Sequence, residues 1–422
     1  MITRIQAFKY RCFDRLDIKV GQYHVLAGAN GTGKSTLLDI PLLLGEILSR
    51  GLIPAFLESP SIAGSPRAQS LQELVHYRRG NYFGFAVEAD LPEEIIIKLL
   101  QFASKNVQND RSKHPYSLRY EIRFQIFNNI ELQVTDEFLY ILPQKVTEPE
   151  TGWGIGGTRP REWIAVIQRE SGEPVSLKVE DRSKNTIELR LEPQELALAN
   201  IPRDATKFPA TTWFRDLLER GVMRYEPSWS MLRRASSPGQ PKTIRSDAAN
   251  LPWVVLSLQE EQPDLFDAWV EHIKMALPNV IGVEAVQREE DYHAYLKLTY
   301  WGNHVVTSSG LSYGTLHILA LTILPYLPKP PSLIFLEEPE NGIHPRAIEI
   351  VMQSLSSVYD SQVWVSTHSP IVLAHTDLKS VIVMRGSKEN GVEAVLGNQH
   401  PRLQDWQGGI DLGSLFAAGV LG

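Results

Sequence analysis

The sequence predicts a mixed α/β fold in which short buried strands end in polar motifs. Three apolar runs, at 23–27, 333–336 and 363–365, are each followed by glycine, acidic or hydroxyl-bearing residues. Short apolar runs with such boundaries are typical of buried strands. Helical spacing after the first two runs supplies the crossover helices that a parallel sheet requires. A further stretch, 118–126, alternates apolar with polar and charged residues, and it predicts an antiparallel strand with one solvated face.

The first apolar run leads into Gly28-Ala29-Asn30-Gly31-Thr32-Gly33-Lys34-Ser35-Thr36, which fits the phosphate-binding pattern G-x-x-x-x-G-K-[ST]. Glycine permits dihedrals at which successive N–H groups point at one anion, and the following helix adds its positive dipole end. Lys34 is expected to reach the β- and γ-phosphates, and the Ser35 hydroxyl is expected to hold Mg²⁺. A chance glycine-rich turn is the alternative, but it would not explain the strand and helix on either side.

The sequence therefore predicts a P-loop that binds ATP and Mg²⁺. The residues expected to line the phosphates are Gly28, Asn30, Gly31, Thr32, Gly33, Lys34, Ser35 and Thr36.

Composition places the chain among ordinary globular proteins. Its 422 residues are 43% hydrophobic and 22% charged. The net charge of −7 does not indicate a protein that binds nucleic acid or an anionic membrane through its overall charge. The single cysteine, Cys12, excludes an internal disulfide framework and a thiolate cluster for zinc. No run of about 18 apolar residues occurs, and the first residues lack the apolar core of a signal peptide. We therefore expect a cytoplasmic protein without membrane contact.

The order of the expected elements divides the chain into three parts. Residues 1–145 hold two short strands, the P-loop and antiparallel strands, and form the first lobe. Residues 146–250 form a helical or irregular insertion, and residues 251–422 form a second lobe with the remaining motifs. Pro41 lies inside the helix expected after the P-loop and should kink or shorten it. Prolines recur so often before residue 311 that a long coiled coil is excluded.

The insertion contains a basic and aromatic segment. Between Pro227 and Ser246 there are four basic residues, no acidic residue and one tryptophan, Trp229. Arginine suits phosphate contacts and tryptophan suits base stacking. Two interpretations stay open, namely a solvated surface insertion and a contact patch for DNA or an acidic partner.

Two carboxylates follow the second apolar run. The strand expected at 333–336 should lie beside the P-loop strand, and Glu337 and Glu338 stand at its carboxyl end. Glu337 can hold the hydration shell of Mg²⁺, and Glu338 can polarise an attacking water molecule. Solvated turn residues are the alternative, but the P-loop in the same chain favours the catalytic interpretation.

A histidine and a second anion site complete the candidates. The third apolar run ends in Ser366-Thr367-His368, and the His368 imidazole can hydrogen-bond a γ-phosphate oxygen. The segment 311–315, LSYGT, opens a helix, so that Ser312, Gly314 and the first-turn amides form an anion site. A second anion site in a protein with one P-loop is explained if it caps the γ-phosphate held by another copy.

Taken in order, the P-loop, LSYGT, LIFLEEPENGIHP and STHSP resemble the ABC-type ATPase superfamily, specifically the SMC/RecF-like AAA_21 group of predicted ATPases. The resemblance implies a two-lobed P-loop NTPase head and a head-to-tail homodimer, with room for a higher oligomer. Two ATP molecules would lie between the P-loop of one copy and the signature motif of the other. Residues 341–344 match the loop that crosses this interface. The implied roles are Lys34 as a catalytic phosphate contact, Ser312 and Gly314 acting in trans, Glu337 as the Walker B acid and Mg²⁺ ligand, Glu338 as the catalytic base, and His368 as the switch histidine.

Two departures argue against a transporter subunit, since Tyr313 and Glu337 stand where transporters usually have Gly and Asp. The resemblance instead implies an ATPase that controls a partner effector, such as a nuclease or a toxin, or DNA. The expected setting is bacterial antiphage defence or DNA repair. Two alternatives remain: a scaffold that uses ATP as glue with negligible turnover, and the less favoured transporter subunit. The intact Glu338 argues against the scaffold.

Overall fold

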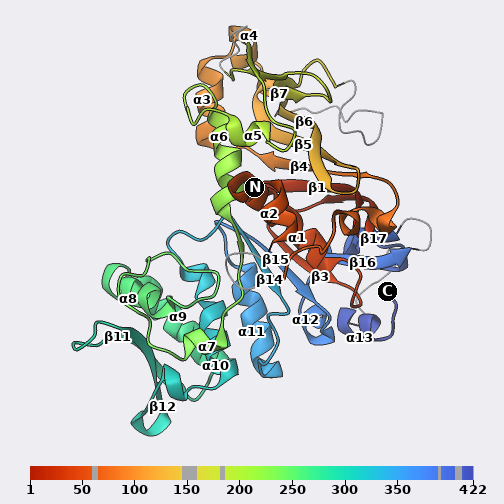
Figure 1. Cartoon of the computed structure of the whole chain (residues 1–422). Helices are drawn as coiled ribbons and strands as arrows, with labels where there is room; N and C mark the ends of the chain where they lie inside the picture. Colours follow the sequence, from red (N-terminus) through yellow and green to blue (C-terminus); the bar gives the residue numbers. More distant parts are fainter. Residues whose placement is uncertain (59–64, 145–158, 181–185, 388–390, 404–410, 422) are drawn as a thin grey trace. The chain divides into compact units, whose positions relative to one another are not determined.

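The computed structural model describes residues 1–58, 65–144, 159–180, 186–387, 391–403 and 411–421 (Figure 1). The chain forms two compact units. The chain passes from the second unit to the first inside the P-loop, between Ala29 and Asn30. The division into lobes at residues 145 and 250 stays a prediction. The first unit comprises Met1–Gly21, Asn30–Val222 and Met384–Val395, and the second comprises Gln22–Ala29, Met223–Val383 and Leu396–Gly422.

The first unit is built on antiparallel strands in the order β17-β2-β1-β4-β5-β6-β7-β8-β9. The alternation at 118–126 lies on β5, whose Tyr120 pairs with Leu139 on β6. Apolar side chains from this strand join an aromatic core, in which the rings of Phe83 and Phe124 lie 5.1 Å apart. The predicted antiparallel subdomain is therefore present. The expected solvated face of β5 is wrong, because Arg119 and Glu121 are buried and hydrogen-bonded to each other. Its strands are β1 (Ile2–Tyr10), β2 (Phe13–Lys19), β4 (Tyr82–Asp90), β5 (Pro115–Phe127), β6 (Glu131–Pro143), β7 (Ile164–Arg169), β8 (Val175–Lys178), β9 (Thr186–Leu189) and β17 (Gly391–Leu396).

The helix after the P-loop, α1 (Lys34–Arg50), continues for 17 residues through Pro41, so the predicted shortening is wrong. Pro41 is buried, and Gly45 on the same helix lies so close to the Leu218 carbonyl that an added Cβ would be 2.1 Å from that oxygen. Tertiary packing of this kind outweighs the loss of one backbone hydrogen bond. The other helical segments of the first unit are α2 (Leu52–Leu57), α3 (Glu93–Gln101), α4 (Lys105–Gln108), α5 (Ala197–Asn200), α6 (Pro209–Asp216), η1 (Leu71–Leu74), η2 (His76–Arg78), η3 (Arg111–Lys113) and the π-helical turn η4 (Leu217–Gly221).

The strands of the second unit lie in the order β10-β14-β15-β3-β16, and β14, β15, β3 and β16 run parallel to one another. Its strands are β3 (Tyr23–Ala27), β10 (Val222–Arg224), β14 (Leu333–Glu337), β15 (Gln362–Thr367) and β16 (Val381–Ser387). The prediction that the Glu337 strand lies beside the P-loop strand is wrong, because β15 lies between β14 and β3. Every residue of β15 is buried, which suits a central position in a sheet covered on both faces.

Helices and a second, three-stranded sheet complete this unit. Helix α10 is apolar on all sides, and its residues Leu316 to Thr322 are all buried. None of the described helices has the length and apolar character that a bilayer crossing demands, and the described part contains no long coiled coil. The remaining elements are α7 (Trp229–Leu232), α8 (Leu251–Glu261), α9 (Pro263–Ala276), α10 (Tyr313–Thr322), α11 (Pro345–Ser356), α12 (Pro370–Ala374), α13 (Leu412–Ala417), β11 (Val280–Gln287), β12 (Ala294–Tyr300), β13 (His304–Thr307), η5 (Trp301–Asn303), η6 (Ser308–Gly310), η7 (Leu324–Tyr326), η8 (Leu378–Ser380), η9 (Gly397–Gln399) and η10 (Pro401–Leu403).

Candidate functional site

The carboxyl ends of three parallel strands lie in register at one edge of the second unit's sheet. Glu337 on β14 pairs with Ser366 on β15, and Ser366 pairs with Leu26 on β3. The chain leaves this edge at residues that the sequence singles out, namely Gly28, Glu338 and His368. In parallel α/β sheets, ligands bind outside the carboxyl ends of the strands. The start of the P-loop, the acidic pair and the histidine therefore share one edge.

From Asn30 onward the P-loop belongs to the first unit. Gly31 and Gly33 have φ angles of 80° and 81°, in the left-handed region that glycine adopts without strain. At Gly33 there is also no room for a side chain, because an added Cβ would lie 2.6 Å from the Cys12 sulfur. Lys34 begins α1 and is 8% exposed, whereas the Ser35 that follows is exposed. Left-handed glycines that lead into a helix N-terminus form an anion-binding concavity, so these residues fit a phosphate chain.

Glu338 is held at both carboxylate oxygens. Its Oε1 lies 2.8 Å from Nδ1 of His368, and its Oε2 accepts a 2.8 Å hydrogen bond from the Asn341 side-chain amide. The Glu338 N–H donates to the Ser366 carbonyl, and its φ of 48° is unusual for a residue other than glycine. The side chains of Glu338 and His368 remain 33% and 48% exposed. The carboxylate is therefore oriented by its neighbours but still open to a water molecule or a ligand.

Glu337 forms an ion pair that the sequence did not indicate. Its Oε1 lies 3.3 Å from Nη2 of Arg224 on the neighbouring strand β10. Arg224 is half exposed and also lies 3.5 Å from Glu226. The guanidinium offsets part of the repulsion between Glu337 and Glu338, and a divalent cation at Glu337 would compete with it.

A third carboxylate, Glu340, was missed from the sequence. It is 9% exposed, and its Oε1 accepts a hydrogen bond from the Thr367 hydroxyl. Its Oε2 is buried and has no hydrogen-bond partner among the described residues. Burial raises the pKa of Glu340, although the hydrogen bond from Thr367 opposes that rise. The Ser369 N–H donates to the same threonine oxygen, so Glu340 fixes the turn that carries His368. Its position two residues after Glu338 in the sequence was the feature that could have identified Glu340 as a site residue.

Ser312 immediately precedes the first residue of α10, and Gly314 is the second residue of that helix. The Ser312 side chain caps this helix, since its Oγ accepts a 3.2 Å hydrogen bond from the Thr315 N–H. An added Cβ at Gly314 would lie 2.5 Å from the Gly342 carbonyl oxygen, so only glycine fits there. Ser312 is exposed, and the helix behind it is long and buried. This arrangement suits an anion at the helix N-terminus.

Residues 162–374, just over half of the chain, match the family model described as "AAA domain, putative AbiEii toxin, Type IV TA system", AAA_21. The chain belongs to the AAA_21 family. The matched residues of this AAA_21 protein include the signature segment, both strand-end carboxylates and His368, and the P-loop precedes them.

A similar solved structure shows the fold of the AAA_21 chain. The chain is similar to the Smc head bound to the C-winged helix domain of ScpA, with 11% identity and a TM-score of 0.51, over 93% of this chain and 97% of that chain. A Smc head domain with an extended coiled coil, bound to the C-terminal domain of ScpA from Pyrococcus furiosus, has 12% identity and a TM-score of 0.47, over 93% and 95%. No curated protein matches the chain. The fold is thus that of an SMC-type P-loop ATPase head, as the sequence motifs predicted.

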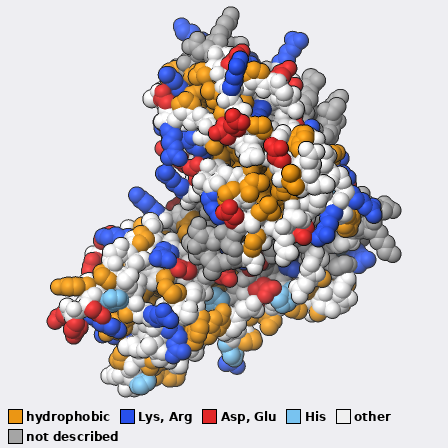
Figure 2. Space-filling model, in the orientation of Figure 1, with side chains coloured by type: hydrophobic (Ala, Val, Ile, Leu, Met, Phe, Trp, Pro, Cys, Tyr) orange, Lys and Arg blue, Asp and Glu red, His pale blue; other side chains and the backbone are white. Residues whose placement is uncertain are grey.

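The basic segment of the AAA_21 chain, 227–246, packs against the signature helix. The Arg233 guanidinium lies 4.8 Å from the centre of the Trp229 ring and donates to the Ser309 carbonyl. The Trp229 ring in turn lies 5.4 Å from that of Tyr313. Two further basic residues form ion pairs, Lys242 with Glu261 and Arg245 with Asp247. Lys and Arg side chains are interspersed with acidic ones on the face shown in Figure 2. DNA contact through this segment stays a prediction.

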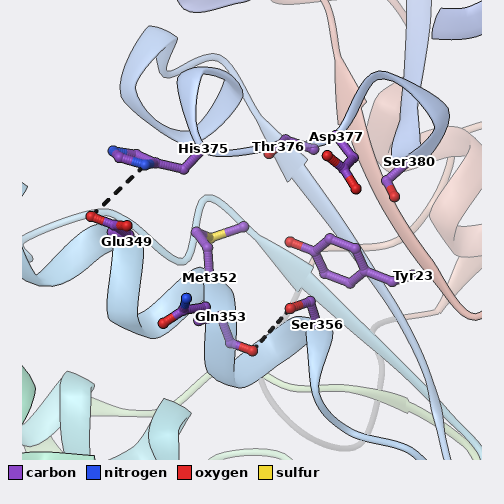
Figure 3. A pocket seen from close by; sticks show the side chains of 9 residues that line it. All are labelled: Tyr23, Glu349, Met352, Gln353, Ser356, His375, Thr376, Asp377 and Ser380. Atoms are coloured by element: carbon purple, nitrogen blue, oxygen red, sulfur yellow. Dashed lines mark hydrogen bonds and ion pairs between the residues drawn. The ribbon is translucent and has the colours of Figure 1, made fainter.

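A pocket of about 270 Å³ lies at the other end of β3, away from these motifs (Figure 3). Tyr23, the first residue of β3, faces side chains from α11 and from the turn after α12. Burial raises the Tyr23 pKa. The lining contains none of the predicted site residues, so the sequence motifs and this pocket are separate features. The lining residues are Tyr23, Glu349, Met352, Gln353, Ser356, His375, Thr376, Asp377 and Ser380.

Proposed function

We propose that this AAA_21 chain binds ATP with Mg²⁺ and hydrolyses it, with Glu338 as the general base. The observation that carries the proposal is the orientation of Glu338 between His368 and Asn341, at the sheet edge where the P-loop begins. A carboxylate whose two oxygens are both fixed can accept a proton from an attacking water molecule in a defined position. His368 lies 2.8 Å from the same carboxylate, and we propose that it senses the γ-phosphate through a hydrogen bond to one of its oxygens.

ATP would be held by residues from Gly28 to Thr36, with Lys34 on the β- and γ-phosphates. Ser35 and Glu337 are the proposed Mg²⁺ ligands. Two protein ligands are sufficient for Mg²⁺, which keeps several water ligands and is usually bound through one or two carboxylates and substrate phosphates. The ion supplies charge neutralisation at the phosphates.

The active form in this proposal is a head-to-tail homodimer, which could extend to a higher oligomer. Ser312 and Gly314 of one copy would complete the γ-phosphate site of the other. The exposed Ser312 at the N-terminus of the buried helix α10 supports an anion contact from outside the chain.

The ATP-dependent dimer would control a partner effector, a nuclease or a toxin, or DNA, in the cytoplasm of a bacterium during antiphage defence or DNA repair. Two findings support a partner. The matching family model carries the name of a toxin–antitoxin system, and the similar Smc head was solved with a domain of another protein bound to it.

Two substitutions test the proposed chemistry, with phosphate release and dimer formation as the measurements. Lys34→Ala should abolish nucleotide binding and hydrolysis together. Glu338→Gln should keep ATP binding but lose about 10²–10⁴-fold in rate, the range that a general base contributes. Because hydrolysis no longer resets it, Glu338→Gln should accumulate as a dimer with ATP in analytical ultracentrifugation.

The control is His304→Leu, at an exposed position on β13, which should behave as wild type. A Glu338→Gln variant that hydrolyses ATP at the wild-type rate, or that stays monomeric with ATP, would overturn the proposal. Wild-type turnover no higher than that of Lys34→Ala would instead favour the ATP-glued scaffold.

A further inference from the structure

We propose that His317 and Asn341 are positioning residues that tie the signature helix α10 to the base Glu338 of the same chain. This inference rests on the proposed function, because it concerns the orientation of the proposed base. It predicts that a ligand contacted by Ser312 and Gly314 changes catalysis at the other ATP site of the dimer.

The start of α10 fits closely against the loop after β14. An added Cβ at Gly342 would lie 2.1 Å from the Tyr313 ring, and one at Gly314 would lie 2.5 Å from the Gly342 carbonyl oxygen. Gly342 also has a left-handed φ of 75°. There is thus no room for even a methyl group between the helix start and the loop, so we expect a shift of the helix start to displace the loop.

A hydrogen bond also joins α10 to the same loop. Nδ1 of His317 lies 3.2 Å from the backbone carbonyl oxygen of Asn341. Burial lowers the pKa of His317, so the ring is neutral at pH 7. Because a carbonyl oxygen can only accept, the proton of the neutral ring must reside on Nδ1. The ring is also 5.2 Å from that of Tyr313, which limits its rotation.

Two hydrogen bonds connect Asn341 to the base Glu338. Its side-chain amide donates to Glu338 Oε2 at 2.8 Å, and its backbone N–H donates to the Glu338 carbonyl at 3.0 Å. Asn341 is thus fixed by His317 through its carbonyl and fixes Glu338 through two donors. A helix, a loop residue and the base form one continuous chain of contacts within the second unit.

The consequence is coupling between the two ATP sites of the proposed dimer. The signature helix of one copy contacts the nucleotide of its partner, and the same helix orients the base that acts on its own nucleotide. Binding at one site would then raise the rate at the other. The two sites are coupled in the thermodynamic sense when the nucleotide at Ser312 and Gly314 binds one placement of α10 more tightly than another, because the loop and Glu338 move with the helix.

The test compares His317→Leu, His317→Asn and Asn341→Ala in steady-state ATP hydrolysis by the full chain. His317→Leu removes the donor, whereas the amide nitrogen of His317→Asn can stand near Nδ1. We expect His317→Leu and Asn341→Ala to lower kcat by about tenfold or more, as a misplaced catalytic group does, with the KM for ATP within about twofold of wild type. His317→Asn should restore most of kcat, and the Hill coefficient should fall toward one only in the two impaired variants.

Several outcomes would overturn the inference. Wild-type kcat in Asn341→Ala would do so even if His317→Leu fails to fold, because the Asn341 side chain is exposed and its truncation leaves no cavity in the core. Equal losses in His317→Asn and His317→Leu would reduce His317 to a packing role. A raised KM with unchanged kcat would place Asn341 on the nucleotide. Wild-type turnover no higher than that of Lys34→Ala would reject the proposed function itself, and this inference with it.

Discussion

The buried carboxyl of Glu180 should make the stability of the protein depend on pH. Glu180 is 3% exposed, and it accepts hydrogen bonds from the N–H groups of Ala210 and Thr211 at the start of α6. Burial raises the pKa of Glu180 from 4.5 to about 7, although these hydrogen bonds oppose the rise. The folded state therefore binds the proton more tightly than the unfolded state does. This group's stabilising contribution is complete below the unfolded pKa and is lost as the pH rises toward 7.

The magnitude follows from the two pKa values. Between about pH 5 and pH 8, a carboxyl with these pKa values lowers the free energy of unfolding by about 2–3 kcal/mol. Glu180→Gln cannot ionise, so the free energy of unfolding should lose this part of its pH dependence. Urea unfolding at a series of pH values, read as the difference between wild type and variant, isolates the effect from other titrating groups.

The matched control is Glu188→Gln, at an exposed position on β9, which should keep the wild-type pH dependence. The amide of Glu180→Gln also loses an acceptor, so its stability at acid pH should fall, and only the slope carries the argument. A Glu180→Gln curve parallel to wild type between pH 5 and pH 8 would refute the reasoning.

Two further predictions concern Glu340 and Arg234. Glu340→Gln keeps an acceptor for the Thr367 hydroxyl and should hydrolyse ATP at close to the wild-type rate. Glu340→Ala frees the turn that carries His368, so it should lose activity as His368→Ala does. Equal hydrolysis rates in Glu340→Ala and wild type would contradict this prediction. Arg234 is exposed, and if the 227–246 segment binds DNA, Arg234→Glu should weaken binding and lower the salt slope by about one or more. Unchanged affinity in a salt-titrated fluorescence anisotropy assay would move any DNA contact elsewhere. Arg233 is unsuitable for this test, because its substitution would also disturb the signature helix.

Strand-level features could be predicted well from the sequence. The P-loop, the apolar strands with polar ends and the alternation on β5 are each written in consecutive residues, so local patterns identify them. The order of parallel strands is not local. Nothing in the residues of β15 states that it lies between β3 and β14, although the apolar run at 363–365 was compatible with a central position.

The side-chain partners within the site were the part that the sequence could not provide. The Arg224–Glu337 ion pair joins residues more than a hundred positions apart, and it forms only because β10 adds to the edge of the sheet. Arg233 and Lys242 were candidates for a nucleic-acid patch, yet both have partners within the chain. Free charge on a surface depends on neighbours in space, which composition does not specify. Glu340 was overlooked because its burial follows from the turn that it helps to fix.

The left-handed backbone at Glu338 has a consequence for how this protein can change. A residue with a Cβ at such dihedrals costs about 1 kcal/mol or more relative to glycine. Glycine would therefore suit the backbone at this position better than the glutamate that is present. A search for more stable variants would find glycine attractive here, and that substitution would remove the carboxylate proposed as the base. Stability and turnover are thus set against each other at a single residue.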